Sequence, residues 1–178
     1  AHIRSGNPFL AGWIAALICY PPFVHGFMGP GGMIQYEYDT AGWGFWFVGH
    51  SPVMWVWAGW LIFLTAVYAW ATVAFGIRFS NLTYRGVLTN GPYAFTRHPA
   101  YLSKNLFWWC STLPFLVTTG SLIEAVRNTV FLACVSGIYY WRARTEEAHL
   151  LAEDAKYRAY HAWMSEHGAI TSRLGLLL

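Results

Sequence analysis

Residues 52–76 read PVMWVWAGWLIFLTAVYAWATVAFG and contain no charged side chain. An α-helix rises about 1.5 Å per residue, so a run of this length can cross the roughly 30 Å of hydrocarbon in a bilayer. The whole chain has 178 residues, of which 56% are hydrophobic and only 11% are charged, whereas soluble domains average about 25% charged residues. We therefore predict an integral membrane protein, surrounded by a lipid bilayer and without a nucleic-acid partner.

Three other apolar segments approach the length of a membrane-spanning helix, at residues 9–28, 101–119 and 121–140. Pro21-Pro22 must kink the first of them or end it early, because proline lacks the backbone donor that a helix interior uses. The expected fold is accordingly an all-α bundle of four transmembrane helices within a single domain over residues 1–178. The sequence begins at Ala1 without a methionine, so a fifth, N-terminal span is expected if the chain is a trimmed product.

The charged residues are unevenly distributed between the predicted loops. The 29–51 loop has two carboxylates, Glu37 and Asp39, and no Lys or Arg, whereas residues 78–104 carry four cations and five more follow residue 141. Cytoplasmic loops of membrane proteins are enriched in Lys and Arg. We therefore predict a multi-pass protein, in the inner membrane if it is bacterial, whose N-terminus, 78–100 loop and C-terminal tail face the cytoplasm.

The end of the fourth predicted span changes character. Residues 141–164 read WRARTEEAHLLAEDAKYRAYHAWM and place apolar side chains among charges at helical spacing. We expect the fourth span to run on into an amphipathic cytoplasmic helix that lies in the headgroup layer, with Tyr157 and Tyr160 toward the lipid.

The cysteines and the 25–50 region give no metal-binding pattern. The three cysteines fall inside predicted spans and have no CxxC spacing, so we read them as small buried hydrophobes. The histidines and carboxylates of the 25–50 region match no ligand spacing. We predict no metal site.

Residues 91–104, GPYAFTRHPAYLSK, form the first polar cluster. The sequence around Gly91 is typical of a turn, and Pro99 suits the first turn of a helix, where its missing N–H has no partner to lose. A helix N-terminus there would attract a carboxylate or phosphate, and the adjacent Arg97 and His98 would add to this affinity. The alternative is that Arg97 and Lys104 are ordinary juxtamembrane charges that reach toward lipid headgroups.

The second polar cluster follows the fourth predicted span. Arg142 and Glu146 are four residues apart, and Arg144 and Glu147 are three apart, so each pair can share a helix face. Alone, these would be surface ion pairs of little energetic value. The third and fourth spans form a hairpin, however, which brings this face close to His98. A pocket there would suit a ligand that has both an anionic and a cationic group.

In this order the segments GPYAFTRHPAY, RARTEEAHL and YRAY resemble the integral-membrane methyltransferases of the isoprenylcysteine carboxyl methyltransferase family, over about residues 76–162. The resemblance implies that the chain transfers a methyl group from S-adenosylmethionine, held in a cytoplasm-facing cavity, to a lipophilic substrate that enters from the membrane. A carboxylate or a thiol, such as an isoprenylcysteine-like compound, is the expected acceptor. A prenylated thiol, a quinone-like phenol and a phospholipid amine remain alternatives.

The resemblance also implies roles for individual residues. Arg142 falls where the family has an arginine that orients the acceptor, and Arg97 lies beside the donor, so these two are the predicted catalytic residues. The implied cofactor-binding residues are Arg85, Gly86, Val87, Leu88, Tyr93, His98, Pro99, Ala100, Tyr101, Glu146 and Glu147. The chain departs from the family pattern at Ser103, where glycine is common, and at Ala155-Lys156, where Phe-Gly is common.

Two other classes compete with the methyltransferase reading. Sterol reductases carry a similar RHPxY pattern but transfer hydride from NADPH, and they usually have more spans than this chain provides. A membrane protein without catalytic activity, which keeps the fold and has lost the donor site, would explain the departures at Ser103 and Ala155.

Overall fold

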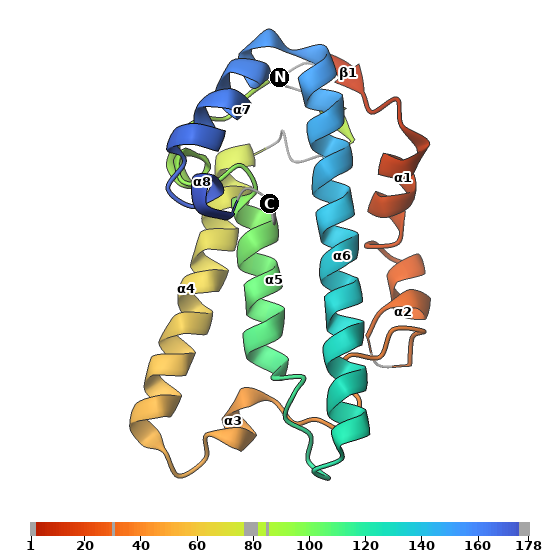
Figure 1. The fold of residues 1–178 in the computed structure, drawn as a ribbon, viewed down its shortest axis with the longest axis vertical. Helices are drawn as coiled ribbons and strands as arrows, with labels where there is room; N and C mark the ends of the chain where they lie inside the picture. The colour runs from red at the N-terminus through yellow and green to blue at the C-terminus, as the bar shows by residue number, and fades with distance from the viewer. Residues whose placement is uncertain (1–2, 30, 77–81, 85, 175–178) are drawn as a thin grey trace. The chain divides into compact units, whose positions relative to one another are not determined.

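In the computed structural model, which describes residues 3–29, 31–76, 82–84 and 86–174, the chain is mainly α-helical (Figure 1). Within the described part, two helices are long and apolar enough to cross a membrane, α4 (Ser51–Phe75) and α6 (Leu122–Glu153). Only 17% and 22% of their most apolar windows are buried inside the protein, which leaves most of this apolar surface for lipid. These two helices support a membrane protein, while its number of passes and its orientation remain predictions.

Comparison with the four expected spans gives two agreements and two differences. Helix α4 matches the expected 52–76 segment to within one residue, and α6 begins where the fourth span was expected. The expected 9–28 span is instead two short helices, α1 (Leu10–Leu17) and α2 (Phe23–Phe27), because Pro21-Pro22 interrupts it. This proline pair ends the helix rather than kinking it.

The expected 101–119 span is also shorter than hydropathy indicates. Helix α5 covers Pro99–Thr112, which is 14 residues or about 21 Å of helix. It stops because Leu113 takes a left-handed φ of 45° and the following Pro114 cannot continue the helix. Its start at Pro99 confirms the sequence prediction.

The chain divides into two compact units, and their boundaries fall inside α1, α4, α5 and α6. Unit 1 comprises Ala1–Ala16, Val67–Leu102 and Tyr139–Leu178, and unit 2 comprises Leu17–Ala66 and Ser103–Ile138.

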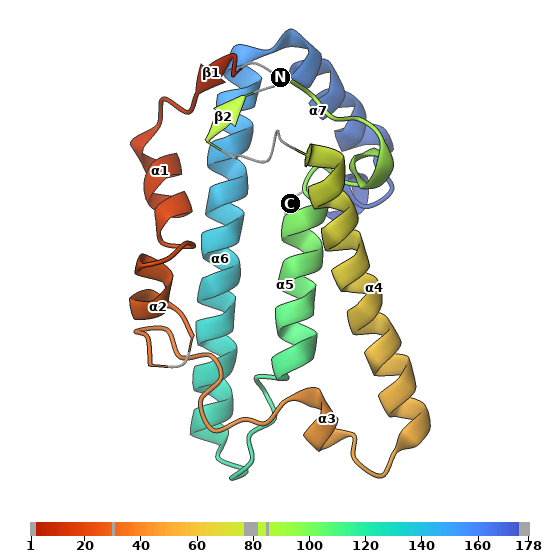
Figure 2. The same ribbon diagram turned by 180° about the vertical axis from the view of Figure 1, so that it is seen from behind.

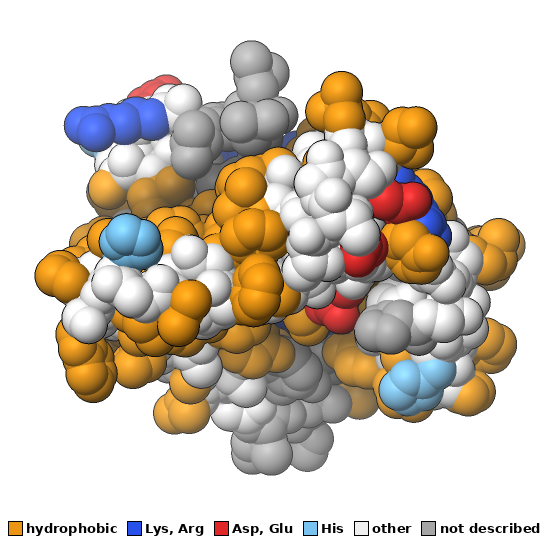
Figure 3. Space-filling model, turned by 90° about the horizontal axis from the view of Figure 1, so that it is seen from below, with side chains coloured by type: hydrophobic (Ala, Val, Ile, Leu, Met, Phe, Trp, Pro, Cys, Tyr) orange, Lys and Arg blue, Asp and Glu red, His pale blue; other side chains and the backbone are white. Residues whose placement is uncertain are grey.

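Unit 2 contains α2, the short α3 (Trp43–Trp46) and the greater part of the long helices. Within it α5 lies between α4 and α6 (Figures 1 and 2), and tryptophan N–H groups link the three. Trp57 Nε1 donates to the Cys110 carbonyl at 2.9 Å and Trp109 Nε1 to Ser136 Oγ at 3.0 Å. Figure 3 shows hydrophobic side chains on the face that it presents, interspersed with other side chains, backbone and a few carboxylates and histidines.

Unit 1 gathers the two ends of the chain around the polar segments. The strands β1 (Ser5–Gly6) and β2 (Thr83–Tyr84) pair antiparallel. The turn expected at Gly91-Pro92 is the 3-10 helix η2 (Gly91–Ala94), where Gly91 adopts a φ of +61° that side-chain-bearing residues rarely take. The unit also holds the start of α5, the end of α6, α7 (Ala155–His167) and α8 (Thr171–Leu174).

The end of α6 confirms one expectation and corrects another. The helix does run on past Tyr140, to Glu153. Asp154 then caps a separate helix, α7, by accepting a hydrogen bond from the Lys156 N–H at 2.7 Å. Two helices therefore stand where one continuous helix was expected.

The orientation expected for the α7 aromatic side chains is wrong. Tyr157 is only 5% exposed, and the Tyr160 hydroxyl donates to the Tyr93 carbonyl at 2.6 Å. These rings pack into unit 1 instead of facing lipid, because this position removes their apolar area from water and also gives the Tyr160 hydroxyl a partner.

Candidate active site in unit 1

A buried carboxylate, Glu147, lies at the centre of the polar residues of unit 1. Its Oε1 forms an ion pair with Arg97, 3.0 Å from Nε, and accepts a hydrogen bond from His98 Nε2 at 3.0 Å, while its Oε2 accepts from Arg144 Nη1 at 2.8 Å. His161 Nε2 lies 3.8 Å from Oε1. We call Arg97, His98, Arg144, Glu147 and His161 the Glu147 cluster. Burying a charge is costly unless it is paired, and here one carboxylate is paired with two guanidinium groups, those of Arg97 and Arg144.

Three segments that are distant in the sequence supply the cluster. Because α5 begins at Pro99, Arg97 and His98 lie just before its first turn. Arg144 and Glu147 are three residues apart on α6, and their predicted ion pair is confirmed. From α7, His161 accepts a hydrogen bond from Arg97 Nη1 at 2.8 Å, and Ser165 Oγ accepts a second at 3.1 Å.

The segment before α5 is also fixed through its backbone. The Arg97 N–H donates to Thr171 Oγ1 at 3.3 Å, and the Ile170 N–H donates to the Phe95 carbonyl at 3.2 Å. Thr171 is fully buried. Figures 1 and 2 show α8, which begins at Thr171, beside the start of α5. The C-terminal helices therefore hold the RHP segment in place.

A second polar pair lies beside the cluster. The Tyr101 hydroxyl donates to Glu146 Oε2 at 3.1 Å, and both side chains are half-buried. The guanidinium of Arg142 lies over the Tyr101 ring, 5.6 Å from its centroid, within the range of a cation–π interaction. We call these two residues the Tyr101–Glu146 pair. Within it, Glu146 is more exposed than Glu147, whose side chain is only 2% exposed.

The tyrosines of η2 and α7 remain protonated at neutral pH. Burial raises the pKa of Tyr93, and the negative charge of Glu146 raises it further. Burial also raises the pKa of Tyr157, and it raises that of Tyr160 to about 12. Their hydroxyls are therefore hydrogen-bond donors to a ligand or to the backbone, and none is a ready nucleophile.

Most of the residues implied by the resemblance lie in unit 1. The contacts described above join several of them. The residues in this unit are Tyr93, Arg97, His98, Pro99, Ala100, Tyr101, Arg142, Glu146 and Glu147. Gly86, Val87 and Leu88 are half-buried in the segment between β2 and η2. Arg85 lies outside the described residues. Ser103, at the position where the family often has glycine, is buried, so its side chain is accommodated there.

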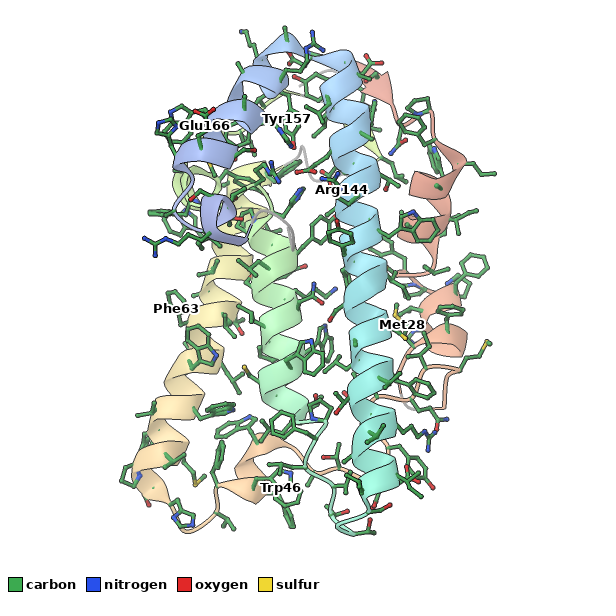
Figure 4. All side chains as sticks on the ribbon, viewed as in Figure 1. Met28, Trp46, Phe63, Arg144, Tyr157 and Glu166 are labelled. Carbon is green, nitrogen blue, oxygen red and sulfur yellow. The ribbon has the colours of Figure 1, made fainter. Side chains whose placement is uncertain are left out.

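Sequence reasoning missed His161, Ser165 and Thr171. His161 follows Tyr157 by four residues and precedes Met164 by three, so it lies close to the buried stripe of α7. The signal in the sequence that could have identified His161 was its place as a polar residue beside an apolar stripe. In Figure 4, Arg144 on α6 and Tyr157 on α7 mark the two helices that contribute to this region. Within the described residues, no group of three or more His, Cys, Asp or Glu side chains is placed to hold a metal ion.

His161 gives the cluster a pH dependence. Arg97 can only donate, so His161 Nε2 accepts and the ring is neutral in this bond. Burial, and then the positive charge of Arg97, lower the pKa of His161 against the opposing charge of Glu147. As the pH falls below the ordinary value of about 6.5, the unfolded chain therefore takes up a proton that the folded protein resists.

We expect the stability of the protein to fall between pH 7.5 and pH 5.5, and the loss to be smaller in His161→Gln, whose side-chain oxygen still accepts from Arg97. The free energy of unfolding in detergent, measured with urea at each pH, checks this. Identical pH slopes for the two proteins would show that His161 does not contribute.

The fold and site together define a helical protein with two candidate membrane-crossing helices and a buried ionic cluster at the start of α5. A family described as "Protein of unknown function (DUF1295)" matches residues 49–164. This is more than half of the chain, and the protein belongs to that family. Comparison with curated proteins and with solved structures gave no match.

Proposed function

We propose that this protein is an integral-membrane methyltransferase that uses S-adenosylmethionine and acts on a lipophilic substrate. The observation that supports it most is the direct pairing of the RHPxY and EE segments. His98 bonds Glu147 at 3.0 Å and Tyr101 bonds Glu146 at 3.1 Å, although each pair of partners is separated by more than 40 residues. These are the segments on which the resemblance to the membrane methyltransferases rests.

The side chains of unit 1 fit the chemistry of the donor. S-adenosylmethionine has a carboxylate, an ammonium group, a positive sulfonium and an aromatic base, and when bound it supplies a methyl group on that sulfonium. The positive end of α5 would favour the carboxylate. Glu146 would favour a positive group, and the rings of Tyr93 and Tyr157 offer flat surfaces. The donor would come from the cytoplasm and the substrate from the bilayer.

The protein's own part in this reaction would be binding, alignment and exclusion of water. The Glu147 cluster holds the start of α5 against α6 and α7, so Arg97 acts as a positioning residue. Arg142, which the sequence predicted to be catalytic, is buried beside Tyr101 and would orient a polar group of the substrate. Holding two reactants in line contributes the largest part of such a transfer.

Binding of labelled S-adenosylmethionine to the detergent-purified protein tests the proposal, with NADPH as the competing ligand. We expect S-adenosylmethionine to bind and NADPH not to compete. Glu146→Ala should weaken binding about tenfold to a hundredfold, since it removes a charged hydrogen-bond partner. Glu153→Ala, an exposed carboxylate at the end of the same helix, is the matched control.

Displacement of the label by NADPH, or donor affinity unchanged in Glu146→Ala, would argue against the proposal. Where the donor binds, membranes are incubated with methyl-labelled donor and the lipid or small molecule that gains label is identified.

A further inference from the structure

The proposed reaction raises the question of which side chain could take a proton from the substrate. An ionised carboxylate is already a nucleophile and needs no base. A thiol or phenol, by contrast, must lose a proton as its lone pair attacks. The titratable side chains near the start of α5 therefore bear on the chemical class of the substrate.

Glu147 is unsuited to accept that proton. Both of its oxygens are engaged, Oε1 by Arg97 and His98 and Oε2 by Arg144. Its side chain is only 2% exposed. Protonation would leave the buried guanidinium of Arg97 without its counter-charge, which is strongly unfavourable. Its role is to hold the cluster together.

Three histidines of this part of unit 1 are engaged as well. His98 Nε2 donates to Glu147, since a carboxylate only accepts. His161 Nε2 accepts from Arg97 Nη1 at 2.8 Å. His149 Nε2 lies 3.0 Å from Ser5 Oγ, and the residue is 1% exposed. Each of these imidazoles already uses its Nε2 in a bond inside the protein.

The Tyr101–Glu146 pair has the properties that the other groups lack. Both side chains are half-buried, and the hydroxyl already donates to the carboxylate at 3.1 Å. A tyrosine hydroxyl accepts a hydrogen bond as well as donating one, so it can relay a proton to a carboxylate bonded to it. The rings of Tyr139 and Tyr101 lie 6.2 Å apart and provide an apolar wall.

We propose that the Tyr101–Glu146 pair accepts the proton of the substrate, and that the substrate is a lipophilic phenol or thiol rather than a carboxylic acid. This inference rests on the proposed function. The substrate oxygen or sulfur forms a bond to the methyl carbon, and the methyl–sulfonium bond breaks with its electron pair remaining on sulfur. The substrate proton passes to the Tyr101 oxygen, and the Tyr101 proton passes to Glu146.

Several charged or titratable groups face Glu146 and influence how readily it takes a proton. They are His98 and Tyr101 at the start of α5, Arg142 and Glu147 on α6, Tyr93 in η2 and Tyr157 on α7.

Binding without methyl transfer tests the pair directly. The probes are 4-octylphenol and its methyl ether, 4-octylanisole, each measured with S-adenosylhomocysteine present so that no transfer occurs. We expect the wild type to prefer the phenol by up to about tenfold, the size of one hydrogen bond to the Tyr101 hydroxyl. Tyr101→Phe should lose that preference and bind the ether like the wild type. The control is Tyr140→Phe, which changes an exposed tyrosine on α6. A preference retained in Tyr101→Phe would overturn the inference.

Methyl transfer gives a second readout with 4-octylphenol, dodecanethiol and dodecanoic acid as probes. At pH 7 we expect label in the phenol or thiol. The rate of Tyr101→Phe on the phenol should be low at pH 7 and rise about tenfold per pH unit toward the phenol pKa of about 10. Three results would overturn the inference. They are a loss of rate in Tyr101→Phe that is equal at every pH, label in the acid alone, and no label at all from a protein that binds the donor. Failure to bind the donor would instead overturn the proposed function.

Discussion

Glu147→Ala should destabilise the protein by about 3–5 kcal/mol, because removing one partner of a buried ionic cluster leaves the others uncompensated. Arg97, His98 and Arg144 each lie within 3.0 Å of this carboxylate, and without it the two guanidinium groups would lose their counter-charge and His98 its hydrogen-bond acceptor. For a chain of this size we expect the midpoint of thermal unfolding in detergent to fall by about 10 °C or more.

The matched control for this variant is Glu166→Ala. Glu166 is on α7, its side chain is 77% exposed and its Oε2 lies 3.9 Å from His167 Nδ1. An exposed pair of this kind contributes about 0–1 kcal/mol, so its unfolding midpoint should match that of the wild type. Glu147→Gln tests the charge separately from the shape and should be nearly as unstable as the alanine variant. Equal midpoints for the Glu147 and Glu166 variants would refute the central role of the cluster.

Local signals predicted some of the helix boundaries, and others depend on features that hydropathy ignores. The apolar run before Gly76 and the proline at position 99 place the extent of α4 and the start of α5 correctly. The end of α5 was missed because the apolar character continues through Leu113 and Pro114, where the backbone leaves the helix. A hydropathy pattern reports which residues avoid water, and it does not report the backbone angles.

The contacts of the candidate site could likewise be predicted only in part. The spacing of Arg144 and Glu147 predicted their ion pair, because residues three apart share a helix face. Glu146 and Glu147, however, are adjacent and point about 100° apart on a helix. Sequence reasoning gave both the same role, whereas one enters the buried cluster and the other pairs with Tyr101. The contact between His161 and Arg97 was not predicted, because it depends on a new helix, α7, that begins after Asp154.

Arg97→Lys should loosen α7 although it conserves the positive charge. Arg97 contacts Glu147 through Nε at 3.0 Å and donates through Nη1 to His161 and Ser165 at 2.8 and 3.1 Å. A lysine ammonium is a single point and cannot hold this planar arrangement. Loss of bonds that involve a charged group costs about 1.5–3 kcal/mol, so the local opening of α7 should become roughly tenfold to a hundredfold more frequent.

Limited trypsin cleavage after Lys156 and Arg158, both exposed on α7, measures this opening. Arg173→Lys, a change at an exposed residue of α8, is the control and keeps the number of trypsin sites equal.

A double-mutant cycle that combines Arg97→Lys with Glu147→Gln then measures the interaction energy between these two residues. Because Arg97 and Glu147 contact each other directly, the loss of stability in the double variant should be smaller than the sum of the losses in the two single variants. Additive losses, or cleavage at the control rate in Arg97→Lys, would mean that Arg97 does not couple the start of α5 to α7.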